Sequence, residues 1–369
     1  MGKSIELLRG GGITCFRSMK IQLTHTYSDI ISVENLLNAW QEFIIGKKTK
    51  PDVKLFARDL MDNILALHED LVKKSYTHGR YHSFYINDPK RRHIHKASVR
   101  DRLLHHAIYR ILYPFFDRTF IADSFSCRDS KGTRKAIERF QSMAYQVSRN
   151  HTRTCWVLKC DIQKFFASVD QKKLFDIVRQ YIPDQDILTL LHKVVDSFHT
   201  TGMPGTGLPL GNLTSQLLTN VYMNVLDQWV KHRLAVETHC VRLTNAKDAF
   251  NASLPYVRYA DDFLFLSANK EWLKSIIPAL RDFLSRELCL TLHPNKIILK
   301  TIASGVDFLG WTHFADHRTL RNKTKQRLFR KIKASPTEAT LQSYLGLLNH
   351  GNAEKIRRQV LGEYWLWQL

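Results

Sequence analysis

Three aspartates stand where largely apolar segments end, at positions that disfavour a carboxylate unless something compensates it. Asp161 follows one such segment, and the pair Asp261–Asp262 separates two others, 256–259 and 263–266. Neighbouring carboxylates in an apolar hairpin repel each other and lose hydration. A divalent cation compensates both effects, and two such ions about 4 Å apart can hold the attacking and leaving oxygens of an in-line phosphoryl transfer. Because Asp is also a common turn residue, the pair taken alone is better explained as an ordinary β-turn.

The segments around these acids predict an α+β fold in which helices cover one face of an antiparallel sheet. Residues 155–160 read as a buried strand, and 254–267 as two strands with Ala260–Asp261 at the bend. Residues 101–116 place apolar side chains at helical spacing, and Pro114 is expected to disrupt the end of that helix. Further helices are expected in 32–75 (two runs), after residue 170, at 212–234, at 272–288 and in the last fifty-odd residues, and further strands near 290–299 and 306–314.

The composition is that of a globular chain with a strong basic surplus. Its 369 residues are 44% hydrophobic and 24% charged, which excludes disorder, collagen and coiled coil as global descriptions. The formal charge of +21 favours polyanionic partners and predicts binding that weakens steeply with salt, although a basic small-molecule enzyme is the alternative. Residues 73–102 carry nine Lys/Arg and two Asp among interleaved aromatics, and 316–369 carry eleven Lys/Arg and four Asp/Glu. The first segment suits stacking of bases and holding of phosphates, or else a β-hairpin with a solvated face.

The sequence gives no indication of a membrane segment. No apolar run approaches the roughly 18 residues of a transmembrane helix, so we expect a cytoplasmic protein without membrane contact. Residues 1–18 surround Gly10–Gly12 and have the pattern of neither a signal-peptide core nor a helix. Met19 is an alternative start, and residues 1–18 are expected to be a disordered tail.

Several short blocks, in their order along the chain, resemble the motifs of reverse transcriptases. Tyr259–Phe263, which reads Tyr-Ala-Asp-Asp-Phe, resembles the Tyr-x-Asp-Asp signature of that family, and Asp161–Asp170 resembles its first catalytic motif. Further blocks resemble the fingers motif (120–132), the loop and helix start beneath the template and incoming nucleotide (207–216), the later palm motif (292–296) and the strand that leads to the thumb (308–311). Six blocks in family order make a chance resemblance negligible.

This resemblance implies the α+β fold of a right-hand polymerase. Its expected parts are an N-terminal helical region with the fingers (19–150), a palm with an antiparallel sheet (151–315, with fingers elements near 170–212) and a short helical thumb (316–369). The implied activity is RNA-directed DNA polymerisation with two Mg²⁺ ions, or Mn²⁺ in their place. The implied partners are template RNA, the RNA/DNA hybrid and dNTPs, and the gene would be bacterial or phage-encoded.

The resemblance also implies roles for individual residues around the acids. Asp161 and Asp261 would coordinate both ions, with Asp262 in support and the backbone carbonyl of Ile162 as a further ligand. Phe166 matches an aromatic gate that collides with a ribose 2′-hydroxyl and so selects deoxynucleotides. The same ring, next to another phenylalanine, is also explained by ordinary core packing.

Two further sets of residues are expected to hold the substrates. Arg128 and Lys131 would hold the triphosphate and Lys296 would protonate the departing pyrophosphate, although each is alternatively an exposed or merely phosphate-contacting side chain. The full dNTP set consists of Phe166, Leu210, Gly211, Gln216, Arg128, Lys131 and Lys296. The nucleic-acid set consists of Arg91, Arg92, Tyr259, Lys323 and Lys325, mostly in the basic segments that would flank the template–primer duplex.

Departures from the common pattern resemble one subgroup, the enzymes of diversity-generating retroelements. Where many relatives read Gln-Gly-x-x-x-Ser-Pro, this chain has Leu210 for the Gln and Gln216 for the Pro, and residues 343–352 also resemble that subgroup. Such an enzyme copies a template-repeat RNA with frequent errors opposite adenine and works with a small basic accessory protein. Leu210 offers the incoming nucleotide only an apolar surface, which weakens discrimination, or else it is a packing variant of ordinary fidelity.

Three other functions stay open at this point. Two are a group II intron-like and a phage-defence reverse transcriptase. The third is a non-catalytic RNA-binding maturase or chaperone on a polymerase scaffold. The last would tolerate loss of Asp161 or Asp261, and the presence of all three acids therefore favours catalysis.

Overall fold

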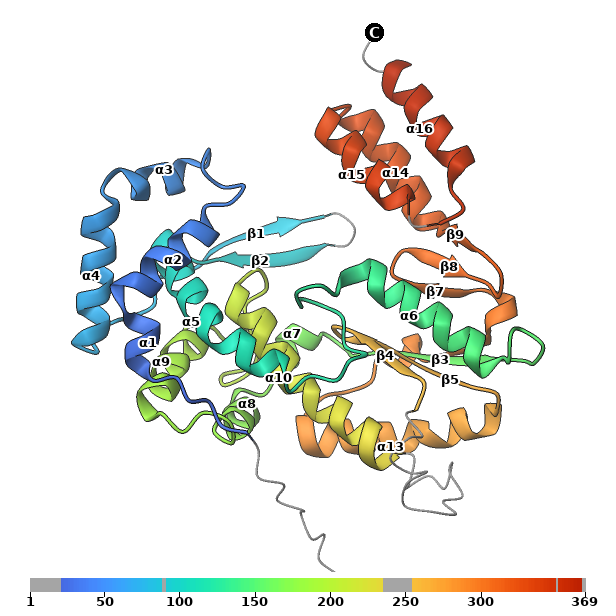
Figure 1. Ribbon diagram of the computed structural model, residues 1–369, viewed down its shortest axis with the longest axis horizontal. Helices are drawn as coiled ribbons and strands as arrows, with labels where there is room; N and C mark the ends of the chain where they lie inside the picture. The colour runs from blue at the N-terminus through green and yellow to red at the C-terminus, as the bar shows by residue number, and fades with distance from the viewer. Residues whose placement is uncertain (1–20, 88–90, 235–253, 350, 367–369) are drawn as a thin grey trace, which may run out of the picture.

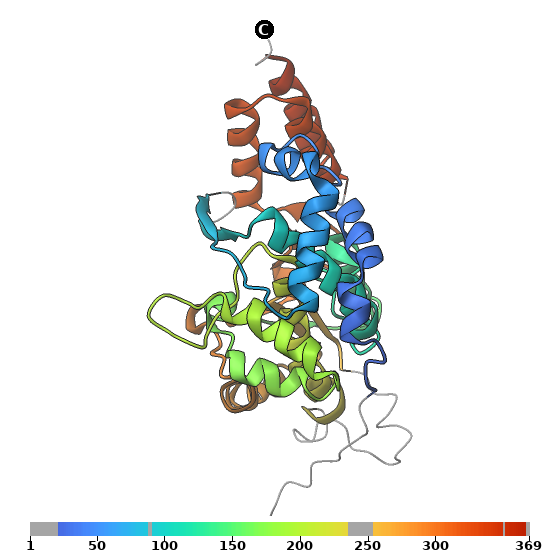
Figure 2. The same cartoon turned by 90° about the vertical axis from the view of Figure 1, so that its left-hand side faces the viewer.

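A computed structural model of the chain describes residues 21–366 apart from 88–90, 235–253 and 350. The expected tail, residues 1–18, lies outside the described residues. Figure 1 shows a broad body that contains the N-terminal helices and a central sheet, with three helices near the C-terminus standing above it, and Figure 2 gives the side view. None of the helices formed by the described residues has the length and apolar character of a bilayer-spanning segment.

A four-stranded antiparallel sheet in the order β4–β5–β3–β6 lies at the centre of the body. Its strands are β3 (Trp156–Asp161), β4 (Tyr256–Tyr259), β5 (Asp262–Ser267) and β6 (Ile298–Thr301). The strands predicted in 155–160 and 254–267 are confirmed. The strand predicted at 290–299 is wrong in its first part, because Pro294–Lys296 forms a 3₁₀ turn and β6 begins only after it. Proline has no backbone N–H to offer a neighbouring strand.

Helices cover both faces of this sheet, so the predicted one-sided cover is wrong. Side chains alternate between the two faces of a strand, and here both sets are apolar. Leu158 and Phe263 point into the larger core, which α10 (Leu213–Trp229) and α13 (Lys270–Leu288) complete. Val157 and Leu264 point to the opposite core with α6 (Gly132–Val147), and Figure 1 shows α6 and α13 on opposite sides of the strands. Strands that are apolar on both faces are buried between two layers.

Helices and one β-hairpin form the N-terminal side of the body. The helices are α1 (Tyr27–Ile31), α2 (Val33–Phe43), α3 (Pro51–Arg58), α4 (Leu60–Val72) and α5 (Val99–Asp117), and the hairpin pairs β1 (His82–Ile86) with β2 (Arg92–Lys96). The two helical runs predicted in 32–75 are confirmed, with the second divided at Asp59. The predicted disruption at Pro114 is wrong, because α5 continues to Asp117 while Phe115 and Phe116 keep its last turn buried.

Short helices connect β3 to α10, and a C-terminal unit follows the sheet and shares its second core through Val306 and Phe308. The connecting helices are α7 (Phe165–Ser168), α8 (Gln171–Val178) and α9 (Gln185–Asp196), and α10 continues as a π-helical turn over Val230–Leu234. The C-terminal unit contains a sheet of β7 (Val306–Phe308), β8 (Trp311–His313) and β9 (Arg318–Leu320), and then α14 (Asn322–Ala334), α15 (Glu338–Leu348) and α16 (Glu354–Leu366). The three helices bury their apolar sides against Trp311 of β8 and Leu320 of β9.

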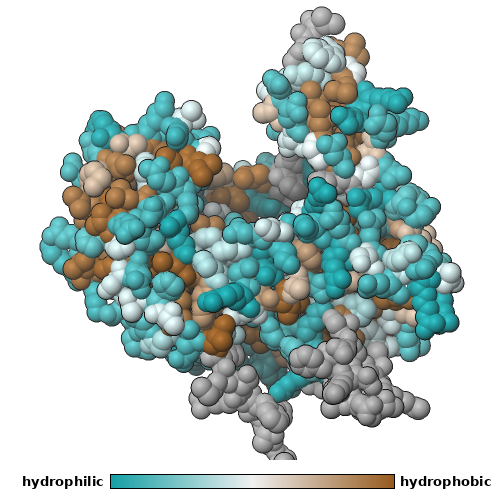
Figure 3. Space-filling view, viewed as in Figure 1, coloured by the Kyte–Doolittle hydropathy of each residue, from teal (hydrophilic) through white to brown (hydrophobic). Residues whose placement is uncertain are grey.

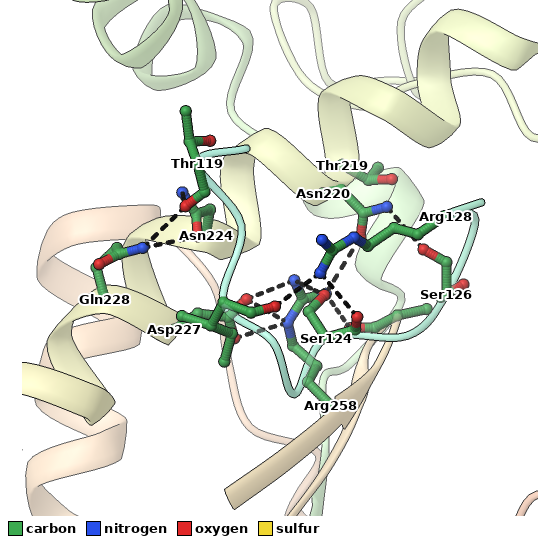
Figure 4. Close-up of polar contacts among 12 residues, drawn as sticks. Thr119, Ser124, Ser126, Arg128, Thr219, Asn220, Asn224, Asp227, Gln228 and Arg258 are labelled. Carbon is green, nitrogen blue, oxygen red and sulfur yellow. Dashed lines mark hydrogen bonds and ion pairs between the residues drawn. The ribbon is translucent and has the colours of Figure 1, made fainter. Parts of the chain in front are cut away.

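A fully buried ion pair joins β4 to α10. The side chains of Arg258 and Asp227 are 0% exposed, and Arg258 Nη2 lies 2.6 Å from Asp227 Oδ2. Arg258 also donates from Nη2 to the Ser124 hydroxyl (2.9 Å) and from Nη1 to the Ala260 carbonyl (2.9 Å), while the Tyr256 hydroxyl donates to Asp227 Oδ1 (2.8 Å). Figure 4 shows Arg258 reaching toward Asp227 with Ser124 beside it. The pair therefore fixes both α10 and the bend that carries Asp261.

We expect Asp227→Asn to lower the free energy of unfolding by about 3–5 kcal/mol, because it leaves Arg258 charged and buried without its counter-charge. Urea unfolding followed by circular dichroism measures the change. Asp227→Leu combined with Arg258→Met should regain most of the loss. Asp282→Asn, which breaks an exposed pair with Arg286, should leave the midpoint unchanged. A loss for Asp227→Asn no larger than that of this control would contradict the assigned role.

Candidate active site

The register of the central sheet brings two of the predicted acids directly opposite each other. In the β3–β5 pairing, Asp161 faces Asp262. Directly opposed residues of antiparallel strands have their side chains on the same face of the sheet. Asp261 lies one residue earlier, in the bend after Ala260, whose left-handed backbone (φ 56°) turns the chain back into β5. The bond from Arg258 to the Ala260 carbonyl holds this bend in place.

Two lysines neutralise the opposed carboxylates. Lys296 places Nζ 3.1 and 3.0 Å from the two carboxylate oxygens of Asp161. Lys159, two residues before Asp161 on β3, places Nζ 2.8 Å from Asp262 Oδ2 and 2.9 Å from the Asp307 carbonyl. Burial raises the pKa of the Asp262 carboxyl, against the opposing effect of Lys159. Asp161 and Asp262 thus each already bind a cationic group, so their positions favour a positive charge.

The donor atoms fit a Mg²⁺ ion that is completed by substrate. Within the described ranges, no group of three or more His, Cys, Asp or Glu side chains is arranged to hold a metal ion. Mg²⁺ needs only one or two carboxylates when substrate phosphates and waters supply its other ligands. Asp161 and Asp262 offer that number from neighbouring strands, and Asp262 Oδ1 is buried with no hydrogen-bond partner among the described residues.

Backbone bonds fix the chain that follows Asp161. Ile162 forms an isolated antiparallel bridge with Leu292, and the His293 N–H donates to the Asp161 carbonyl (2.8 Å). These contacts hold the 3₁₀ turn that contains Lys296 beside Asp161. The Ile162 carbonyl therefore belongs to a well-anchored segment next to the acids, and its role as a ligand stays a prediction.

A basic groove of about 810 Å³ opens over the two opposed acids. Its lining includes Asp161, Asp262 and Asp307. It also includes seven cationic residues from β3, β6, the turn before β6, α14 and the position just before α14: Lys159, Lys296, Lys300, Arg321, Lys323, Arg327 and Arg330. Figure 3 shows the surface hollowed between the N-terminal helices and the C-terminal helices. Positive charge above carboxylates is the arrangement that attracts a polyanion to a cation-binding floor.

A second cavity of about 400 Å³ contains the third acid. Asp261, Phe166 and Leu210 line it together, as do His93 and His95 of the hairpin. The structure thus brings Phe166, the predicted gate, and Leu210, the predicted apolar contact for the nucleotide, into the same cavity as Asp261. These three residues come from α7, the loop before α10 and the bend before β5, so their meeting depends on the fold.

A row of stacked groups leads along the hairpin into this second cavity. Arg91 lies over the Tyr85 ring (4.2 Å to its centroid), Tyr85 stacks on His93 (4.5 Å), and His93 contacts His95 (4.2 Å between centroids). His95 then contacts Phe198 (4.7 Å), which also lines the cavity. The hairpin predicted as an alternative for 73–102 is present, and it carries the aromatics on an exposed edge. A surface of this kind suits stacking of unpaired bases.

The structure places the two expected triphosphate ligands elsewhere. The Arg128 side chain is 5% exposed, and its guanidinium donates to the Asp117 carboxylate and to the carbonyls of Ile121 and Ser124. Lys131 donates to a backbone carbonyl (2.8 Å), and neither residue lines a cavity that contains an acid of the site. In this structure Arg128 therefore holds its own loop together, and a contact with triphosphate would require that network to open.

The remaining predicted residues are spread over three surfaces. Gly211 and Gln216 line a third cavity, separate from the acids. Lys323 lines the basic groove, and Lys325 lies on the same helix but is not part of the lining. Arg92 is exposed at the start of β2, and the Tyr259 hydroxyl lies 3.2 Å from the Thr133 hydroxyl.

Sequence reasoning missed two contributors to the site, Lys159 and Phe198. Lys159 had a usable signal, since residues i and i+2 of a strand share a face and Lys159 must therefore lie on the side of Asp161. Phe198 had none, because its approach depends on how distant segments pack. The α14 arginines that line the groove belong to the basic C-terminal segment that was expected to flank the duplex.

Comparison with known proteins agrees with this geometry. The chain is 24% identical to protein YkfC of Escherichia coli (strain K12) over 314 residues, which is 78% of this chain and 80% of YkfC. It is 22% identical to the group II intron-encoded protein LtrA of Lactococcus lactis over 65% of this chain and 47% of LtrA. It is 23% identical to a putative COX1/OXI3 intron 1 protein of Saccharomyces cerevisiae over 61% of this chain and 32% of that protein. The chain thus spans less than half the length of these two intron-encoded relatives.

The family comparison covers the central sheet, the hairpin, the second cavity and the part of the basic groove that lies outside α14 and Arg321. Residues 73–313, more than half of the chain, match the model of the family described as reverse transcriptase (RNA-dependent DNA polymerase). The opposed acids on β3 and β5 lie within that span. This chain belongs to the reverse transcriptase family and is an RNA-directed DNA polymerase related to group II intron enzymes and to YkfC.

Proposed function

We propose that Asp161, Asp261 and Asp262 are the acids of a two-metal nucleotidyl transfer that copies an RNA template into cDNA. The observation that supports this most is the pairing of Asp161 with Asp262 across β3 and β5, beneath a groove lined by seven Lys and Arg residues. In the reaction, the primer 3′-oxygen attacks the α-phosphorus of a dNTP, and pyrophosphate leaves. Bound Mg²⁺ would lower the pKa of the 3′-hydroxyl and neutralise charge that builds on the phosphates.

The protein's own residues prepare this chemistry. Asp161 and Asp261 would hold the ions, and Asp262 would support them from the opposite strand position. Lys296, now on Asp161, would turn to the leaving pyrophosphate when a metal takes its place. Its side chain is 40% exposed, so this movement needs no repacking of the core.

We propose that the parts of the structure correspond to the fingers, palm and thumb of a right-hand polymerase. The four-stranded sheet with α10 and α13 would be the palm, joined by α6, which lies in the expected fingers range 19–150 but packs on β4 and β5. The hairpin, its supporting helices and the elements near 170–212 would be the fingers, and α14–α16 the thumb. The basic lining of α14 would then hold the RNA/DNA hybrid by contacts with its phosphates. The row from Arg91 to Phe198 would contact unpaired bases of the template.

Asp161→Asn and Asp261→Asn should each slow extension of a primed RNA with Mg²⁺ and dNTPs by at least about 10³-fold. Each substitution removes a carboxylate whose negative charge would hold the metal ions. Single-turnover extension assays measure the rate, and the exposed Asp282→Asn variant is the matched control. Binding of the RNA should be retained in all three variants. Wild-type protein that binds RNA but does not extend the primer would instead support the maturase or chaperone function.

Phe166→Ala should admit ribonucleotides, because the ring lines the same cavity as Asp261 and blocks space near the sugar. We expect the ratio of kcat/KM for rNTP over dNTP to rise by about tenfold or more, which corresponds to relief of a clash worth about 1.4 kcal/mol. Phe198→Leu, in the same cavity, is the control for a general loosening. If Phe166→Ala keeps its activity and its ratio of kcat/KM for rNTP over dNTP is unchanged, the Phe166 ring only packs in the core and does not select the sugar.

We further propose that the enzyme serves a diversity-generating retroelement and copies a template repeat with errors opposite adenine. Leu210 lines the cavity with Asp261 and Phe166, and it presents only an apolar surface there. A polar side chain in its place would make contacts that depend on correct geometry, and their absence lowers discrimination. A group II intron-like or phage-defence role is the alternative, and a small basic accessory protein would accompany the retroelement role. A genomic neighbourhood without a near-duplicate repeat that differs at adenines would favour the defence role.

Leu210→Gln should raise fidelity on an adenine-rich RNA template. We expect sequencing of the cDNA to show an error rate opposite adenine that falls by about tenfold relative to wild type, since one restored polar contact changes selectivity by about that factor. Leu208→Met, a buried neighbour in the same cavity, is the control. Equal error rates opposite all four template bases in the wild-type enzyme would contradict the retroelement assignment.

A further inference from the structure

Lys159 lies on the same face of the central sheet as the two opposed acids. It stands two residues before Asp161 on β3, and residues i and i+2 of a strand point to the same side. Across the pairing with β5 it faces Leu264, so Asp262 is its diagonal neighbour. Diagonal neighbours are close enough for a long side chain to bridge. The register thus places the lysine within reach of Asp262, while Asp161 pairs with Lys296.

The ammonium group of Lys159 is held from two sides. Its Nζ donates to Asp262 Oδ2 (2.8 Å) and to the Asp307 backbone carbonyl (2.9 Å). The side chain is mostly buried, and Nζ lies 5.8 Å from the centroid of the Phe308 ring. Hydrogen bonds from a charged donor are among the stronger ones, and two of them restrain the same nitrogen here. Lys159 is therefore fixed by the protein itself, although it lines the basic groove.

The second acceptor of Lys159 belongs to a sheet that holds it in place. Asp307 lies on β7 and is paired in register with Thr312 of β8. Its carboxylate accepts from the Thr312 hydroxyl (2.7 Å) and forms an ion pair with Arg321 (2.8 Å). The backbone of Asp307 is thus fixed both by strand pairing and by contacts of its own side chain. The bond from Lys159 to its carbonyl therefore connects Asp262 to the first strand of the C-terminal sheet.

The contact with Lys159 restricts what Asp262 can do. One of its two carboxylate oxygens accepts the bond from the lysine, so Asp262 cannot present both oxygens to an ion while that bond is present. Its support of the metal ions is then confined to one oxygen in a fixed orientation. Groups that orient the ligands of a metal affect its chemistry without touching it. A misplacement of about 1 Å in a catalytic site can reduce the rate by about 10²-fold.

We propose that Lys159 is a positioning residue of the nucleotidyl transfer, which holds Asp262 in one orientation and does not contact the nucleic acid. This inference rests on the proposed function and gives Lys159 a role that differs from that of other cations in the groove. Lys323 lines the same groove from α14 and is exposed, which suits a contact with phosphates. The ammonium group of Lys159, by contrast, is already bound to a carboxylate and to a carbonyl.

The first test is a double-mutant cycle on the rate of primer extension. Lys159→Met keeps an unbranched side chain but removes the ammonium group. We expect single-turnover extension of a primed RNA to slow by about 10- to 10²-fold in this variant, because the Asp262 carboxylate is then free to turn. Asp262→Asn should also slow extension. The double variant should be no slower than Asp262→Asn alone, within about twofold, since the lysine acts only through that carboxylate.

Two binding measurements separate a positioning residue from a phosphate contact. Fluorescence anisotropy at several salt concentrations gives the affinity for the primed RNA, which Lys159→Met should leave unchanged together with its salt dependence. The matched control Lys323→Met should weaken binding and reduce the slope of log affinity against log salt by about one. Calorimetric titration of Mn²⁺ into the protein without nucleic acid should show that Lys159→Met binds the ion at least as tightly as wild type, because a positive charge beside the acids is removed.

Several results would overturn the inference. They are unimpaired extension by Lys159→Met, additive losses in the double variant, and a smaller salt slope or weaker Mn²⁺ binding in Lys159→Met. If Lys159→Met does not fold, the double variant, which removes both charges of the pair, is compared with Asp262→Asn, and a further loss of extension overturns the inference. A wild-type protein that does not extend primers contradicts the proposed function itself, whereas these results in an active enzyme contradict only the role of Lys159.

Discussion

The buried pair of Arg258 and Asp227 is the constraint on which the geometry of the acids depends. A guanidinium has donors in several directions, and here they connect α10, the hydroxyl of Ser124 and the carbonyl of Ala260. A lysine offers one ammonium and could not hold these three groups in one plane. The bend that carries Asp261 is therefore set by a helix that is far from it in sequence.

The same helix also reaches the nucleotide-sized cavities. Asp227 lies near the C-terminal end of α10, while Leu210, Gly211 and Asn212 lie in the loop at its N-terminal end. The Leu210 carbonyl accepts from the His95 N–H (3.1 Å), and Asn212 donates to the His95 carbonyl, so this loop is tied to the hairpin. A shift of α10 along its axis would move both the acids and the walls of the cavities. This one helix thus relates the position of the acids to the position of the cavity walls.

Sequence reasoning succeeded where a local pattern decides the structure. Apolar runs broken by Ala260 and Asp261 predict two strands and a bend, and the pairing of Asp161 with Asp262 then follows once β3 lies beside β5. It failed where tertiary packing decides. The packing of α6 on the second face of the sheet could be predicted only from the apolar side chains of Val157 and Leu264. These side chains indicate that the strands are buried, but they do not indicate which helix covers them. The burial of Arg128 could not be anticipated, because its partners come from a neighbouring helix end and from backbone carbonyls.

The two lysines on the acids differ in a way that matters for cation binding. Lys296 is 40% exposed and forms an ion pair with Asp161, whereas Lys159 is 16% exposed, pairs with Asp262 and is also held by the Asp307 carbonyl. Replacing Lys296 by a divalent cation requires rotation of a side chain into solvent, while replacing Lys159 requires breaking a contact with β7. Asp307 also binds Arg321, the residue before α14. The environment of Asp262 is therefore linked to the C-terminal helices. At Asp161, by contrast, a cation from the groove can replace Lys296 without breaking such a link.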